Sequence, residues 1–111
     1  MAAELNDYRC IGGVTSTADL GKTHNGTFVC RWYLRVDTTV GEQIEWVDLF
    51  CEWYGKRAKR HENIKLGARI MVGGKLIQRR TVGELYATGL LVTSVVPIGV
   101  EERVDSDPAV R

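Results

Sequence analysis

The sequence predicts an all-β domain, a five-stranded Greek-key barrel with one short helix between the third and fourth strands. Two long segments alternate apolar and polar side chains with a period of two, as half-buried strands do. Other segments are runs rich in branched or aromatic residues, bounded by glycine, asparagine or proline. A single polar stretch, rich in lysine and arginine, interrupts the series after the third strand.

The first strand is expected at Tyr8–Val14, where Gly12-Gly13 indicates a bulge or a sharp bend. The next stretch, Thr15–Gly26, is rich in threonine, serine, glycine and asparagine, so it is expected to be a loop. Its last two residues, Asn25-Gly26, are a strong turn signal that leads directly into the second strand.

The second strand, Thr27–Asp37, has the clearest alternation in the chain. Because successive side chains of a strand point to opposite faces, its residues fall into two sets. The set expected to face the core is Cys30, Trp32, Leu34 and Val36, and the opposite set is Val29, Arg31, Tyr33 and Arg35.

The third strand is expected at Gln43–Tyr54, after a turn around Gly41. The chain then changes character, and Gly55–Leu66 predicts a short polar helix. Gly67 lies where a helix C-terminus needs a left-handed residue.

The fourth strand is expected at Ala68–Arg80, with Ile70, Val72 and Leu76 facing inward. Gly73-Gly74 lies inside this strand, so it indicates a bend of the barrel rather than a phosphate-binding loop.

Val82-Gly83 is expected to connect this strand tightly to the last one, Leu85–Val96. Three strands, a short helix and two more strands follow the order of the OB-fold. We expect the domain to comprise residues 1–98, with residues 99–111 as a flexible polar tail.

The bulk composition limits the class of protein. At 111 residues the chain is long enough for one hydrophobic core. No apolar run approaches the roughly 20 residues of a membrane span, and the N-terminus lacks the features of a signal peptide. The three cysteines (Cys10, Cys30 and Cys51) include no Cys-x-x-Cys pair. We therefore expect buried thiols in a reducing compartment, the cytoplasm, and neither a zinc ribbon nor a disulfide scaffold.

Charge is unevenly distributed along the chain, although the net charge is only +1. Residues 1–52 hold 4 basic and 8 acidic residues, residues 53–80 hold 9 and 1, and residues 81–111 hold 2 and 5. A basic segment between acidic flanks fits a surface that binds a polyanion, and it fits equally well a solvated helix face with scattered lysines.

Five short motifs occur in order between Asn6 and Val96. They are Gly12-Gly13-Val14; Asn25-Gly26-Thr27 with Val29, Trp32 and Leu34; Glu45-Trp46; Gly55-Lys56-Arg57-Ala58-Lys59; and the run from Leu66 to Leu76. In this order and at this spacing they resemble the motifs of the bacterial single-stranded DNA-binding protein (SSB) family. The resemblance implies an OB-fold domain that binds single-stranded DNA in replication, recombination or repair. It also implies a homo-oligomer, a tetramer or a dimer, associated with the nucleoid and with other replication or repair proteins as further partners.

Four features depart from the family pattern. One is the presence of one or two extra residues between Trp46 and Gly55, which leaves Trp53 and Tyr54 as alternatives for one aromatic position of the family. The loop Asp37–Glu45 is short, Thr81 stands where many members have a tryptophan, and Asp105–Arg111 lacks the acidic tip that recruits replication proteins. The missing tryptophan and the absent acidic tip favour an alternative, a primosome-type OB protein that mainly holds protein partners at forks and binds single strands weakly. An RNA-binding or purely protein-binding OB module is a third reading, because a fold does not determine its function.

Sequence-independent binding of a single strand needs aromatic faces for unstacked bases and cations for phosphates. Tyr33 lies between Arg31 and Arg35 on one strand face and suits both needs, although exposed ion pairs would also explain the arginines. Trp46 and Tyr54 share the parity that would face DNA. Trp53 is an equal candidate if the third strand contains a bulge.

The basic candidates lie at the start of the helix and near the end of the fourth strand. They are Lys56, Arg57, Lys75, Arg79 and Arg80, to which the family's Tyr-x-Thr motif adds Tyr86. Each alone is explained by a solvated charge, and together they form a plausible phosphate track.

Catalytic and metal-binding patterns find little support. His24 and His61 lack the spacing of metal ligands, and a solvated loop explains Asp37, Glu42, Glu45 and Asp48. We expect no enzyme activity, no cofactor and no membrane partner.

Overall fold

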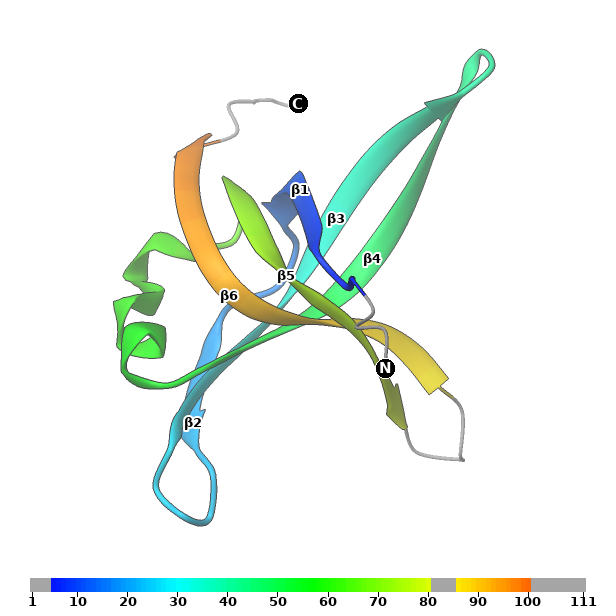
Figure 1. Ribbon diagram of the computed structural model, residues 1–111. Helices are drawn as coiled ribbons and strands as arrows, with labels where there is room; N and C mark the ends of the chain where they lie inside the picture. The colour runs from blue at the N-terminus through cyan, green and yellow to red at the C-terminus, as the bar shows by residue number, and fades with distance from the viewer. Residues whose placement is uncertain (1–4, 81–85, 101–111) are drawn as a thin grey trace.

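The computed structural model describes residues 5–80 and 86–100. Within these ranges the chain forms six strands and one short 3₁₀ helix (Figure 1). Their bounds are β1 Tyr8–Val14, β2 Asp19–Lys22, β3 Phe28–Val40, β4 Gln43–Tyr54, η1 Lys56–Asn63, β5 Ala68–Arg80 and β6 Tyr86–Val100. The predicted connection at Val82-Gly83, Thr81 and the tail residues 101–111 lie outside the described residues.

The strands close into a ring, which confirms the predicted all-β OB-fold. The sheet order runs from β1 through β5, β6 and β4 to β3, and β1 completes the ring by pairing with β3 at Gly13 and Val14. The β4–β6 pair is parallel, and the others are antiparallel. The helix η1 connects β4 to β5, as the sequence predicts. Beyond the ring, the β3–β4 hairpin extends as a long arm (Figure 1).

The expected loop at Thr15–Gly26 contains a strand that its composition concealed. β2 pairs antiparallel with the start of β3, with Lys22 opposite Phe28. Asp19–Lys22 contains a single large apolar residue, Leu20, so it shows no alternation to recognise, and the prediction of five strands missed this segment. The Asn25-Gly26 turn is confirmed, because Gly26 has a φ of 90° and its N–H donates to the carbonyl oxygen of Thr23 at 2.9 Å.

Glycine permits two close approaches between strands, at the places where the sequence predicts bends. A Cβ on Gly12 would lie 2.5 Å from the carbonyl oxygen of Arg35, at the point where β1 passes from β5 to β3. A Cβ on Gly74 would lie 2.1 Å from the carbonyl oxygen of Leu91, where the β5–β6 register shifts. Both contacts are with backbone atoms, so a larger residue at either position would separate the strands.

Gly74→Ala is therefore expected to destabilise the domain by about 1–3 kcal/mol, the usual cost of overpacking. Gly21→Ala on β2 is the matched control, because a Cβ there would have no atom within 4 Å. Urea unfolding followed by circular dichroism measures both variants. Equal losses at the two positions would contradict close approach as the reason for glycine at position 74.

The core is built from alternate residues of the strands. Cys30, Trp32 and Leu34 are at most 1% exposed, which confirms the predicted inward set of β3, and Val36 packs against its edge. The other buried members are Val14, Leu49, Cys51, Trp53, Ala58, Ile64, Ala68, Ile70, Val72, Leu90 and Val92. Ala58 and Ile64 come from η1 and from the residue that ends it, so the helix packs onto this core.

Two predicted orientations are wrong. Val29, expected on the outer face, is 1% exposed; it lies opposite Tyr54, where β4 turns into η1. Leu76, expected in the core, is 38% exposed. It pairs with the buried Leu90 but lies past the bend at Gly74, where β5 leaves the barrel (Figure 1).

The helix is shorter and tighter than the predicted span Gly55–Leu66. It is a 3₁₀ helix over Lys56–Asn63, with non-helical dihedral angles at Arg60. Gly67 has the predicted left-handed conformation, with a φ of 88°. It lies beyond the helix end, however, and its N–H donates to the carbonyl oxygen of Val14 at 2.9 Å, so it joins the connection to β1 rather than capping the helix.

The buried thiols of β3 and β4 resist ionisation. Burial raises the pKa of Cys30 to about 11 and that of Cys51 to about 12. The unfolded chain releases these thiol protons near the ordinary pKa of 9.0, whereas the folded chain retains them. The free energy of unfolding is therefore unaffected by the two thiols below pH 9.0, and it falls as the pH rises from 9.0 toward 12.

We accordingly expect neither Cys30 nor Cys51 to react with a thiol reagent in the native protein at about pH 8, whereas both react after denaturation. Mass spectrometry of the labelled peptides identifies the modified positions. Rapid labelling of either residue before unfolding would contradict the burial described above.

Candidate nucleic-acid interface

Two long neighbouring strands present one continuous outer surface. The β3–β4 register runs without interruption from Val29 opposite Tyr54 to Val40 opposite Gln43. Side chains of directly opposite residues lie on the same side of a sheet. The outward pairs are Arg31 with Glu52, Tyr33 with Phe50, Arg35 with Asp48 and Asp37 with Trp46. We call this surface, together with Tyr54, the β3–β4 face.

Two aromatic rings form the centre of the β3–β4 face. Tyr33 is 48% exposed, and its ring centre lies 5.1 Å from that of Phe50 at an interplanar angle of 47°. The backbone of Tyr33 is held by the loop before β2: its N–H donates to Ser16 Oγ at 2.8 Å, and its carbonyl accepts from the Thr15 N–H at 3.0 Å. The ring pair therefore sits on a rigid part of the barrel.

An ion pair borders the ring pair on the side of η1. Arg31 Nε lies 2.9 Å from Glu52 Oε2, and the hydroxyl of Tyr54 donates to the same oxygen at 3.4 Å. Glu52 is only 4% exposed, so its carboxylate needs these partners. The hydrogen bond to Glu52 raises the pKa of Arg31. The charge of this arginine is thus largely compensated within the fold.

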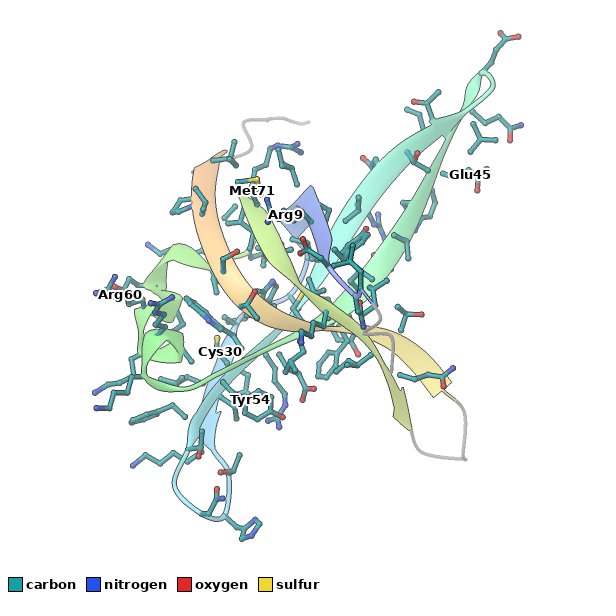
Figure 2. The ribbon with its side chains drawn as sticks, in the orientation of Figure 1. Arg9, Cys30, Glu45, Tyr54, Arg60 and Met71 are labelled. Atoms are coloured by element: carbon teal, nitrogen blue, oxygen red, sulfur yellow. The ribbon has the colours of Figure 1, made fainter. Side chains whose placement is uncertain are left out.

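A second ion pair borders the rings toward the hairpin. Arg35 Nε lies 3.2 Å from Asp48 Oδ1, and its guanidinium carbon lies 4.8 Å from the ring centre of Trp46. Trp46 is 57% exposed. The β3–β4 face therefore offers exposed aromatic surface at Tyr33, beside the half-buried ring of Phe50, and again at Trp46. Figure 2 labels residues near the two ends of β4: Glu45 lies on the arm, and Tyr54 lies at the other end of the strand, just before η1.

Trp53 is corrected from a candidate DNA platform to a core residue. Its side chain is 7% exposed, and its ring meets that of Trp32 edge-on at 6.4 Å and 78°. Because β4 has no bulge against β3, the inward alternation continues from Leu49 through Cys51 to Trp53. Tyr54 consequently shares the outer face with Trp46.

Four members of the β3–β4 face were not predicted from the sequence: Phe50, Asp37, and the acids Glu52 and Asp48 that pair with the arginines. Phe50 lies midway between Trp46 and Tyr54, at the same parity, and this spacing was the available signal. Asp48 lies on β4, within the span predicted for the third strand, and it pairs with Arg35 instead of being a solvated charge of the hairpin loop. The arginines of the predicted site are thus ion-paired, as the competing explanation of their pattern predicts.

The predicted basic track is only partly brought to this surface. Lys75 is exposed on β5 and stands in a row across the sheet with Leu91, Glu52 and Arg31. Lys56 and Arg57 are exposed at the start of η1. Arg79 and Arg80 end β5 and Tyr86 begins β6, but their side chains lie outside the described part of the structure.

A hollow of about 370 Å³ adjoins the ring pair. It is lined by Ser16, Thr17, Asp19, Arg31, Trp32, Tyr33 and Phe50. Among residues 5–80 and 86–100, no group of three or more histidine, cysteine or acidic side chains is arranged to hold a metal ion. In the same ranges, no helix has the length and apolar character needed to cross a bilayer.

Comparisons with known proteins place the fold. No protein-family model matches the chain, and no curated protein sequence matches it. Among solved structures, the fold is similar to the crystal structure of the SSB domain of a protein from Synechococcus sp.. The TM-score is 0.67, and the match covers 86% of this chain and 99% of that chain at 17% sequence identity. At this identity the similarity establishes a shared fold.

Proposed function

We propose that the protein binds single-stranded DNA without sequence preference, and that the β3–β4 face receives the bases. The observation that carries the proposal is the ring pair of exposed Tyr33 and half-buried Phe50, with exposed Trp46 further along the same face. Unstacked bases stack on such rings whatever their identity, because every base has a π-face. The sequence motifs and the SSB-domain fold of the Synechococcus protein support the same reading.

Because of the ion pairs of the β3–β4 face, base stacking and phosphate binding are assigned to different residues. Arg31 and Arg35 are paired with carboxylates, so they contribute geometry more than net positive charge. In the proposed complex the guanidinium of Arg35 supports the ring of Trp46. Phosphate contacts then come from cations that have no ion pair in the described part of the chain, and Lys75 and the lysines of η1 are suited by position.

The direct test is a titration with oligo-dT followed by tryptophan fluorescence at two salt concentrations. Trp46 is the exposed reporter, whereas Trp32 and Trp53 are buried. We expect quenching that weakens at the higher salt. Trp46→Phe should lose most of the quenching and still bind a labelled oligonucleotide. An absence of both quenching and binding at micromolar oligo-dT would refute the proposal. A titration with oligo-U in the same assay compares the affinity for RNA with that for DNA.

A second candidate function is a primosome-type module that mainly holds protein partners. The arm of the β3–β4 hairpin favours it, because Val40, Ile44 and Val47 are 44–66% exposed there. If wild-type protein binds oligo-dT only weakly and without quenching, this candidate is preferred over the first.

We also propose that the protein acts in replication, recombination or repair as a homo-oligomer. From Tyr8 to Gly12, β1 pairs only with β5 among the described strands, so its other edge is open to a second copy. Sedimentation equilibrium distinguishes a monomer from a dimer or a tetramer.

A further inference from the structure

A second cluster of aromatic and cationic side chains lies where β3 begins, outside the β3–β4 face. Phe28 is the first residue of β3 and is half-buried. Lys22 Nζ lies 4.8 Å from the centre of its ring, and Lys59 Nζ lies 5.0 Å from the same point. Two ammonium groups from different elements therefore share one ring. We call these three residues and Lys56 the Phe28 cluster.

The fold brings the members of this cluster together through contacts that do not depend on their charges. Lys22 on β2 lies directly opposite Phe28 in the β2–β3 pairing. The N–H of Gly55 donates to the carbonyl oxygen of Phe28 at 2.8 Å, which ties the start of η1 to β3. Ala58 is fully buried and anchors η1, so that the next residue, Lys59, reaches the ring.

Within residues 5–80 and 86–100, the charges of the Phe28 cluster have no acidic partner. Among the described residues, no ion pair involves Lys22, Lys56 or Lys59, in contrast to Arg31 and Arg35 of the β3–β4 face. A hollow of about 280 Å³ adjoins the ring and is lined by Gly26, Thr27, Phe28, Gly55 and Lys56. Ammonium groups held close together beside an open hollow attract an anion.

We propose that the Phe28 cluster binds the sugar–phosphate backbone of the DNA strand and extends its path past the β3–β4 face; this inference rests on the proposed function. The two sites are adjacent in the chain, because Tyr54 ends the β3–β4 face and Gly55 lines the hollow. Phosphate is the ligand rather than a base, since both lysines lie over the ring that a base would need. Phe28 is a positioning residue that holds the lysines by cation–π contact.

The test measures oligo-dT affinity over a salt series, by anisotropy of a labelled oligonucleotide. Each lost phosphate contact should make the negative slope of log K against log salt less steep by about 0.7. At 0.1 M salt this corresponds to a loss of affinity of about five-fold. Lys22→Gln and Lys59→Gln should each lose about one contact, and the double variant about two. Lys65→Gln is the matched control, an exposed lysine with no part in the cluster.

Phe28 is tested by two substitutions that differ in the ring. Phe28→Tyr keeps the aromatic face and should retain the wild-type salt slope, whereas Phe28→Leu should lower it. Urea unfolding of both variants shows that they are folded. A wild-type slope in the Lys22/Lys59 double variant would overturn the inference and leave the proposed function standing. Failure of the wild-type protein to bind any oligonucleotide would instead overturn the proposed function.

Discussion

Trp32→Ala is expected to lower the free energy of unfolding by about 3–5 kcal/mol, as large-to-small substitutions of buried aromatic residues do. Trp32 is 1% exposed in the centre of β3 and meets the edge of Trp53. Its neighbours on the inward face, Cys30 and Leu34, are held by strands on both sides, so they cannot collapse into the space that the indole leaves. The loss of stability is therefore the sum of the transfer free energy of the removed indole and the cost of the cavity that it leaves.

Trp46→Ala provides the contrast, because the same residue type is 57% exposed there. We expect a change of about 0.5 kcal/mol or less, as for most surface substitutions. Urea unfolding should be followed by circular dichroism, since both substitutions alter the fluorescence. Similar losses for the two variants would contradict the assignment of Trp32 to the core and of Trp46 to the surface.

The alternation of β3 explains why much of the fold could be predicted from the sequence. A strand with one buried face must place apolar residues at every second position, and Cys30, Trp32 and Leu34 satisfy this. The same rule identified Tyr33 as exposed, because it lies between two buried neighbours. Where a strand extends beyond the barrel neither of its faces covers the core, so the alternation no longer predicts burial. Leu76 is therefore exposed despite its inward parity.

The partners across the β3–β4 face could not be predicted in the same way. Arg31 and Glu52 are 21 residues apart, and their pairing depends on where the hairpin turns. Val40 pairs with Gln43, and Gly41 between them has a φ of 62°, so the turn has two residues and sets every pair along both strands. The sequence indicates a turn around Gly41 without its length. A change of one residue would have exchanged Phe50 for Leu49 opposite Tyr33.

Removing the central rings is expected to have the largest effect on DNA binding. Tyr33→Ala and Phe50→Ala should each weaken oligo-dT binding by about 5- to 150-fold, which corresponds to about 1–3 kcal/mol per stacked base. Tyr33→Phe is the matched control and should bind nearly as wild type does, because the ring provides the stacking surface. Unfolding curves confirm that each variant is folded.

The combination of variants separates stacking from electrostatic attraction. The two rings touch, so the double variant should lose less affinity than the product of the single losses. Neither substitution changes a charge, so the dependence of log K on log salt should keep its wild-type slope while the affinity falls. The lysine variants of the Phe28 cluster should do the opposite and lower the slope. Wild-type affinity in both Tyr33→Ala and Phe50→Ala would mean that bases do not stack on the β3–β4 face. A lower slope in Tyr33→Ala would mean that this region of the face binds phosphate, through arginines that the ion pairs leave available.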